Sequence, residues 1–264
     1  MTDVFSAERI DPSVLDERRR AELSKQLYVV HRTAFAGLDW HAFDRYVVNS
    51  PAQETRLLLY RNRDRELIGY FGVHRFDMEV DGQPIVVFRA EVGLRPEFRQ
   101  RDAILSFWWT EATKFKIRHP GKDVYFFFVP VNPSSYAMVA RYIHESYPGR
   151  SHDIPADKLG LMMQLASRFG LTPVHEGSPL VRKVGWMTQA TGQEKDYWRS
   201  STNPYVRFYI DANPTYAEGH GLLTLVPVTI ANTLFSLLGV AFHVLRKRLG
   251  TFRRLRPVHE IPQS

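Results

Sequence analysis

The order of a strand, a charged turn, a helix and a second strand over residues 85–131 constrains the fold of this chain more than any other feature. Residues 85–94 are a mostly apolar run, residues 96–102 are charged, and apolar residues then recur at helical spacing. Residues 124–131 are a second apolar run, which we interpret as a buried strand. Two strands joined through one helix usually lie parallel, with a right-handed crossover. The sequence therefore predicts a parallel strand pair.

An antiparallel meander is expected before this pair. Residues 56–60 and 67–74 are strand-like and are separated by a polar turn, and Asp81-Gly82 is a tight-turn signal between residues 76–80 and 85–94. An amphipathic helix precedes them, with one apolar stripe: Leu23, Leu27, Val30, Ala34 and Phe35. We therefore predict an α+β fold, a mixed sheet with an antiparallel meander and a central parallel strand pair, flanked by helices.

The second half of the chain has weaker patterns. It predicts a helix over residues 132–142, a helix at about 156–169, strands at about 180–187 and 222–226, and a short helix around 205–210. No stretch rich in Pro, Gly or Ser separates a second domain. We expect a polar lead-in over residues 1–22, one domain over 23–227 with an insertion at about 150–220, and a C-terminal elaboration over 228–264.

The basic residues are concentrated at the C-terminal end. The formal charge of the chain is +7, and residues 246–264 contribute +5 of it, which leaves +2 for the rest. A nearly neutral body argues against a nucleic-acid partner. The absence of cysteine excludes a thiol nucleophile and thiolate metal sites. Residues 1–20 have no apolar core of the kind a signal peptide needs, so we expect a cytoplasmic protein.

Residues 228–245 form an uncharged segment that is followed at once by Arg246-Lys247-Arg248. Its polar and small residues fall on one narrow helical stripe. Three interpretations remain open: a helix packed on the body with this stripe outward, an interfacial membrane helix anchored by the basic tail, and a membrane span. The second predicts peripheral contact with the inner face of a membrane through Val228–Arg256.

Two segments carry a resemblance to a known family. Residues 92–99, Val-Gly-Leu-Arg-Pro-Glu-Phe-Arg, precede a helix, and the apolar run 124–131 is followed by Asn132 and later by Tyr142 and Tyr147. Together with the order of the elements, these segments resemble the GNAT superfamily of N-acyltransferases. The resemblance extends over about residues 23–147. It implies transfer of an acyl group from acetyl-CoA or a longer acyl-CoA to a small-molecule amine or amino-acid acceptor.

The resemblance also implies which residues contact the donor: Leu94, Arg99, Gln100, Arg101, Ala103 and Asn132. A helix N-terminus suits a pyrophosphate, because its unpaired N–H groups and partial positive charge face the anion. In the family this loop carries glycines, whereas Gln100, Asp102 and Ile104 stand here. The departure leaves open an acyl carrier protein as the donor, and a non-catalytic module that only binds an acyl ligand.

The candidate catalytic residues are Glu91, Tyr142 and Tyr136. Glu91 shares a strand face with Arg89, and a carboxylate facing a cleft could act as a base; the alternative is a structural pair with Arg89 or a lysine. By the resemblance, Tyr142 would be the acid that protonates the departing thiolate, with Tyr136 as the alternative. The ten histidines show no metal-binding spacing, so no metal is expected.

Overall fold

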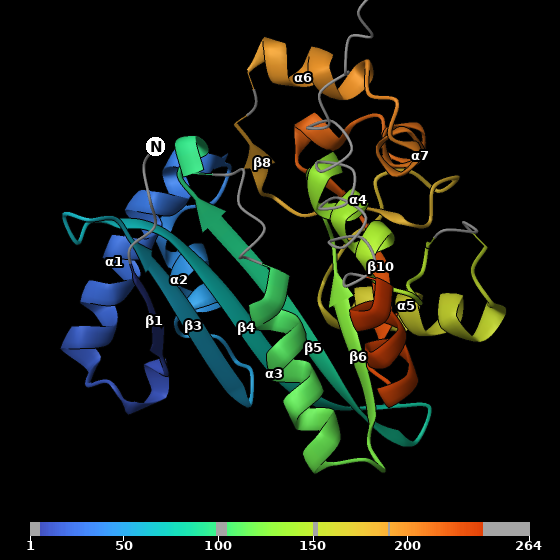
Figure 1. Ribbon diagram of the computed structural model, residues 1–264, viewed down its shortest axis with the longest axis horizontal. Coiled ribbons are helices and arrows are strands. Elements are labelled where there is room, and N and C mark those ends of the chain that lie inside the picture. Colours follow the sequence, from blue (N-terminus) through green and yellow to red (C-terminus); the bar gives the residue numbers. More distant parts are fainter. Residues whose placement is uncertain (1–5, 99–104, 150–152, 190, 240–264) are drawn as a thin grey trace, which may run out of the picture.

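The computed structural model describes residues 6–98, 105–149, 153–189 and 191–239 of this chain. Its centre is a six-stranded sheet in the order β1-β3-β4-β5-β6-β10 (Figure 1). Only β5 and β6 pair in parallel, and the other neighbours pair antiparallel. The bounds of these strands are β1 Ser6–Ile10, β3 Glu54–Arg61, β4 Leu67–Val80, β5 Gln83–Leu94, β6 Asp123–Phe128 and β10 Thr224–Pro227. The predicted α+β mixed sheet with one parallel pair is confirmed.

Helices cover both faces of the sheet. The helix α3 packs on one face, where Trp108 and Ala112 join a core with Phe88 and Phe126. On the other face, two separate cores lie beneath α1 and α2 and beneath α5. The α-helices are α1 Glu17–Ala34, α2 Trp40–Val47, α3 Leu105–Arg118, α4 Pro133–Tyr142, α5 Ala156–Arg168, α6 Gly192–Arg199 and α7 Pro204–Ala212. Short strand pairs complete the fold: β2 Phe35–Ala36 with β8 Met187–Thr188, and β7 Val181–Lys183 with β9 His220–Leu222.

The element order that the GNAT resemblance implied is present as α1, β3, β4, β5, α3, β6 and α4. Four details differ from the sequence prediction. The strand predicted at about 180–187 is wrong, because only residues 181–183 (β7) and 187–188 (β8) are extended, and they pair in two different sheets. The runs 67–74 and 76–80 form one strand, β4, and α2 and α6 were not predicted. Residues 6–22, part of the expected polar lead-in, contain β1 and the first six residues of α1. Polar side chains do not prevent pairing here, because β1 is an edge strand that bonds to β3 through its backbone.

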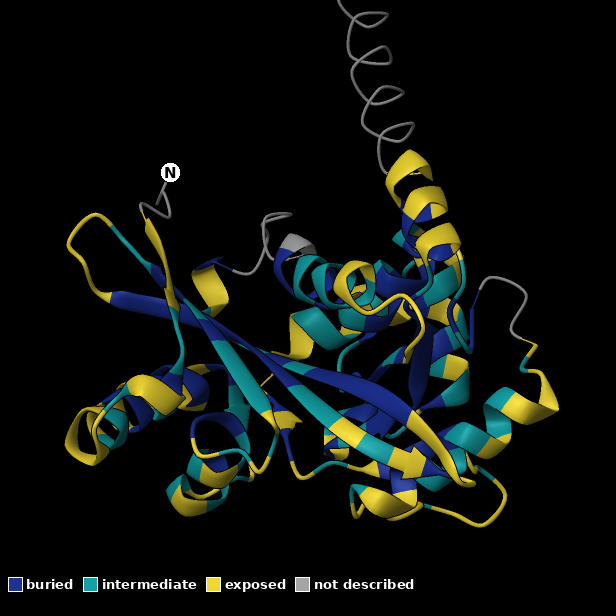
Figure 2. Ribbon diagram, turned by 90° about the horizontal axis from the view of Figure 1, so that it is seen from below, coloured by how far each residue is buried: buried dark blue, intermediate teal, exposed yellow. Residues whose placement is uncertain are grey.

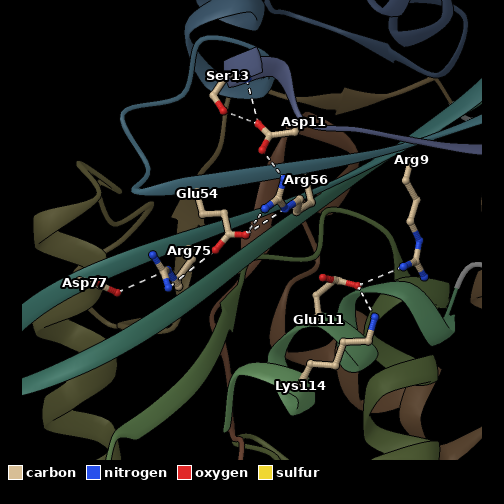
Figure 3. A network of polar contacts seen from close by, with 9 residues as sticks. All are labelled: Arg9, Asp11, Ser13, Glu54, Arg56, Arg75, Asp77, Glu111 and Lys114. Atoms are coloured by element: carbon tan, nitrogen blue, oxygen red, sulfur yellow. Dashed lines mark hydrogen bonds and ion pairs between the residues drawn. The ribbon is translucent and has the colours of Figure 1, made fainter. Parts of the chain in front are cut away.

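An ion-pair network fastens the N-terminal strand to the sheet (Figure 3). Arg56 on β3 bonds to Asp11, which follows β1, and its Nη2 lies 2.7 Å from Oε1 of Glu54. Glu54 also lies 3.7 Å from Arg75 of β4. Asp11 in turn caps the next turn by accepting from the Ser13 backbone N–H at 2.9 Å. The network therefore joins three strands at the end of β3 where residue 54 lies.

The helix over residues 230–239 packs on the body with its polar side. Its buried residues are Asn232, Thr233 and Ser236. Asn232 donates to the carbonyls of Glu145 and Pro227 at 2.9 and 2.7 Å, and its Oδ1 accepts from the Glu145 N–H at 2.9 Å. The outer surface is apolar and 52 to 65% exposed, and it consists of Ile230, Leu234, Phe235, Leu237 and Leu238 (Figure 2). The interpretation with the polar stripe outward is therefore wrong for these residues.

The described ranges contain no helix with the length and apolarity needed to cross a bilayer. Residues 240–256 of the predicted contact segment lie outside the described residues.

Candidate active site

The two parallel strands separate toward their carboxyl ends (Figure 1). Their pairing runs from Ile85 with Asp123 to Phe88 with Phe126, although β5 continues to Leu94 and β6 to Phe128. A cavity of about 150 Å³ lies where they diverge. It is bordered by residues 89–92, residues 128–131 and the first turns of α4, with Phe35, Tyr46 and Trp186 from other segments. Beyond this point, the backbone of β5 on the β6 side lies beside the cavity and is not paired with β6.

Glu91 is the carboxylate of this cavity. Its side chain is 4% exposed, and its Oε1 lies 2.9 Å from Nε2 of His74. Nδ1 of His74 lies 2.9 Å from the hydroxyl of Thr55. A carboxylate can only accept, so Nε2–H donates to Glu91, and in the neutral ring Nδ1 accepts from Thr55. The other oxygen, Oε2, is buried and has no hydrogen-bond partner among the described residues.

Gly72 makes room for this carboxylate. It lies opposite Glu91 in the β4–β5 pairing, and a Cβ at this position would collide with Oε1 of Glu91. The cross-strand neighbour of Glu91 must therefore lack a side chain for the His74 contact to form.

Two further polar groups border the cavity. Arg89 is 8% exposed, and its guanidinium carbon lies 5.3 Å from the centroid of the Tyr46 ring and 4.4 Å from that of Phe169. Burial raises the pKa of Tyr46, and the opposing effect of Arg89 is smaller, so this phenol keeps its proton at neutral pH. The cavity thus combines a carboxylate, a guanidinium and a neutral phenol.

A second buried pair supports the same sheet face. The Tyr70 hydroxyl lies 3.1 Å from Nδ1 of His31 on α1. Burial lowers the pKa of His31 to about 4, and burial together with the Glu91 charge raises the pKa of Tyr70 well above its ordinary value. Both side chains are therefore neutral at pH 7, which is consistent with their place among the rings of Phe43 and Trp186.

The remaining predicted residues of the described chain lie at different distances from the cavity. Asn132 caps α4, accepting from the backbone N–H and the hydroxyl of Ser134 at 2.9 and 2.7 Å. Tyr136 is fully buried against Tyr209 and donates to the Pro148 carbonyl at 3.2 Å. Neither Tyr136 nor Tyr142 borders the cavity. Tyr142 ends α4, three residues and about 4.5 Å along the helix beyond the cavity-lining Val139.

Leu94 is buried at the end of β5. The predicted donor residues Arg99, Gln100, Arg101 and Ala103 lie outside the described residues, as do Asp102 and Ile104.

Sequence reasoning missed three groups of this site: Tyr46, His74 and the role of Arg89 as a cavity residue. Tyr46 lies on α2, which was not predicted. His74 could have been found, because the Asp81-Gly82 turn fixes the β4–β5 register and makes His74 a diagonal neighbour of Glu91.

A larger hollow of about 480 Å³ lies at the other end of β5, between the β4–β5 hairpin and the end of α3. It is open, and β5 and β6 are still paired there, so we place the candidate site at the smaller cavity. In the described parts of the chain, no three His, Asp or Glu side chains gather as they would around a metal ion.

No protein-family model and no curated protein matches this sequence. Among solved structures, the chain is similar to NAA60 of Arabidopsis thaliana in complex with acetyl-CoA, with 13% identity and a TM-score of 0.36 over 84% of this chain and 99% of that one. It is similar to a chain of the NatC complex bound to Gag peptide and CoA, with 10% identity and a TM-score of 0.38 over 85% and 100%. An acetyltransferase of the GNAT family from Streptococcus pneumoniae matches with 13% identity and a TM-score of 0.33 over 53% and 87%.

These identities and TM-scores are too low to carry an activity to this chain. The strand order, the single parallel pair and the crossover through α3 make the fold of this chain GNAT-like.

Proposed function

We propose that this protein transfers an acyl group from a thioester donor, an acyl-CoA, to an amine acceptor at the cavity between β5 and β6. The observation that carries the proposal is Glu91: a buried carboxylate beside a cavity, with one oxygen held by His74 and the other without a described partner. Such a group can accept a proton from an incoming ammonium. The cavity lies where two parallel strands leave room for an extended thioester arm.

The reaction forms one C–N bond and breaks one C–S bond. Oε2 of Glu91 takes one proton from the ammonium, the neutral amine attacks the thioester carbonyl, and the thiolate leaves; the nitrogen then loses its second proton as the thiolate gains one. Backbone N–H groups of β5 beyond Phe88, where β6 no longer pairs, support the carbonyl oxygen as it gains charge. Among these groups, the GNAT resemblance implies that the backbone N–H of Leu94, at the strand end, donates the hydrogen bond to the carbonyl oxygen.

The acid for the thiolate is one of two tyrosines. Tyr46 borders the cavity and is neutral at pH 7, whereas Tyr142 is the residue that the resemblance favours. We propose Tyr46 because of its place, and a comparison of Tyr46→Phe with Tyr142→Phe tests it. A larger fall in the rate for Tyr142→Phe would reverse the assignment. The hydroxyl of Tyr136 already donates its proton to the Pro148 carbonyl, so we do not propose Tyr136 as the acid.

The donor phosphates would contact Arg99, Gln100, Arg101 and Ala103, with Asn132 at the start of α4. An acyl carrier protein is the alternative donor, and it is acidic. Activity with palmitoyl-acyl carrier protein that disappears at high salt, with none from palmitoyl-CoA, would favour that donor.

The test of the proposal is thiol release. The full chain is incubated with acetyl-CoA or palmitoyl-CoA and a mixture of amines and amino acids. A colorimetric thiol assay measures the released CoA, and mass spectrometry identifies the acylated amine. We expect acceptor-dependent thiol release. Binding of the thioester without any product, with either donor, would support the non-catalytic module instead.

We also propose that the protein contacts the inner face of an anionic membrane. The apolar surface of residues 230–239 faces away from the body, and the sequence places six basic residues and no acidic one within residues 246–256. An apolar helix face next to a basic segment is the pattern of interfacial binding. A membrane would bring a lipid-like donor or acceptor close to the site.

Vesicle sedimentation tests this contact. The full chain is mixed with vesicles of phosphatidylcholine alone or with phosphatidylglycerol. We expect it to pellet with the anionic vesicles, and the Leu234→Gln/Leu238→Gln variant to stay in solution. The Val29→Gln/Ile117→Gln variant is the matched control, since both residues are exposed on other helices. A dimer in analytical ultracentrifugation that only the first variant abolishes would assign the apolar surface to a second copy instead.

A further inference from the structure

Arg89 is a buried cation with no counter-ion among the described residues. It is 8% exposed and borders the cavity, and its Nε has no hydrogen-bond partner in that part of the chain. The nearest candidate on its own strand face, Glu91, pairs with His74 instead. The contacts of the guanidinium are the faces of two aromatic rings, Tyr46 and Phe169.

Two rings do not complete the environment of a guanidinium. Cation–π contacts offset part of the cost of removing it from water, but the five N–H donors of arginine still need acceptors. A buried charge is normally paired, because an unpaired one is expensive. The planar fork of arginine matches a carboxylate, which it binds through two parallel hydrogen bonds. An anionic group that enters the cavity would therefore find its partner in Arg89.

The position of Arg89 relative to Glu91 restricts this group further. The two residues are two positions apart on one strand face, so their backbones are separated by about 7 Å. A molecule that carries an ammonium and a carboxylate on one carbon has the two charges that this carboxylate and this guanidinium would bind. The ammonium then faces Oε2 of Glu91, and the carboxylate faces Arg89. The small cavity and its aromatic border suit a single amino acid rather than a polymer.

We propose that Arg89 binds the α-carboxylate of an amino-acid acceptor whose amine faces Glu91. This inference rests on the proposed acyl transfer and names its acceptor class. The product is an N-acyl amino acid: the carboxylate does not react, and it serves to orient the nitrogen toward the thioester.

Matched pairs of acceptors test the inference. Each amino acid is compared with the amine that lacks only its carboxylate: L-phenylalanine with phenethylamine, L-leucine with 3-methylbutylamine, and glycine with methylamine. We expect kcat/KM to favour at least one amino acid over its amine by about tenfold or more, which is what one charge-assisted contact supplies. Arg89→Met removes the preference, and Arg89→Lys, which keeps the charge but not the fork, retains part of it.

Binding without turnover separates this inference from the proposed function. The probe is L-phenylalanine, titrated by ligand-observed NMR into the Glu91→Gln variant and into Glu91→Gln/Arg89→Met, both checked for folding by circular dichroism. Binding that requires Arg89 supports the carboxylate site even if no acyl transfer is found. Equal binding to both variants would overturn it.

A second outcome would also overturn the inference. A carboxylate can come from the donor, as in succinyl-CoA. The wild type could prefer succinyl-CoA over acetyl-CoA while using L-phenylalanine and phenethylamine with equal kcat/KM. If Arg89→Met then abolishes the preference for succinyl-CoA, Arg89 binds the acyl group and not the acceptor.

Discussion

Nε2 of His74 lies 2.9 Å from Oε1 of Glu91, across the β4–β5 pairing and within the buried face of the sheet. Thr55 on β3 holds the other ring nitrogen at 2.9 Å. The three residues lie on three adjacent strands, so the orientation of the carboxylate is set by the sheet itself. The hydrogen bond fixes one oxygen and leaves the second buried and without a partner among the described residues, so that it is free to take up a proton.

His74 is therefore a positioning residue, and its loss should affect rate more than folding. We expect His74→Gln to lower kcat by about 100-fold, the effect of a small misplacement of a reacting group, and to move the acid limb of the pH–rate profile. The exposed His175→Gln is the matched control. An unchanged pH–rate profile in His74→Gln would show that the His74 contact is only structural.

Gly72 lies on β4 opposite Glu91, and Gly72→Ala should displace the Glu91 carboxylate. The new methyl group meets Oε1 of Glu91, so the His74 contact breaks, and we expect activity to fall by about 100-fold. Gly160→Ala is the control, because a Cβ there meets nothing within 4 Å. Steady-state kinetics on both variants checks this, and equal activity in Gly72→Ala and the wild type would contradict the role given to Gly72.

The buried His31 predicts how stability depends on pH. Burial lowers its pKa to about 4 in the folded protein, whereas the unfolded chain takes up the proton near the ordinary value of 6.5. Protonation below pH 6.5 therefore favours the unfolded state. We expect this residue to lower the free energy of unfolding by about 2 kcal/mol between pH 7 and pH 5. Urea titrations of the wild type and His31→Phe measure it, and equal pH slopes would exclude the effect.

Asn232 is expected to hold the outward-facing helix on the body. Its side chain makes three hydrogen bonds with buried or half-buried backbone groups, so Asn232→Ala should lower the free energy of unfolding by about 2 kcal/mol. The exposed Ala231→Ser is a matched control one residue away. Denaturant unfolding measures both variants. No difference between them would mean that the polar side of the helix contributes nothing to its attachment.

Much of the sheet could be predicted from the sequence because its signals are local. The Asp81-Gly82 turn sets Val80 opposite Gln83, and counting outward from it gives Arg89 opposite His74 and Glu91 opposite Gly72. The change from strand to helix period after residue 94 predicted the crossover and thus the parallel pair. Glu91 was identified for the same reason, since alternation alone places it on one face.

The rest of the site depends on contacts between segments far apart in the chain. Tyr46 lies on an eight-residue helix that the pattern of apolar residues did not reveal. Whether Glu91 would pair with Arg89 or with another residue could not be decided from one strand, and the partner proved to be His74. The helix over residues 230–239 also depends on distant segments. A polar stripe usually faces water, but here the carbonyls of Glu145 and Pro227 accept hydrogen bonds from Asn232, which lies on the stripe.

The central claim is that Glu91 is the base of an acyl transfer, and Glu91→Gln tests it most directly. The measurement is thiol release from acyl-CoA with a saturating amine acceptor, compared with the exposed Glu17→Gln. We predict that Glu91→Gln lowers kcat by about 10²–10⁴-fold while the donor still binds, and that Glu17→Gln leaves it unchanged. An unchanged kcat in a correctly folded Glu91→Gln protein would contradict the account.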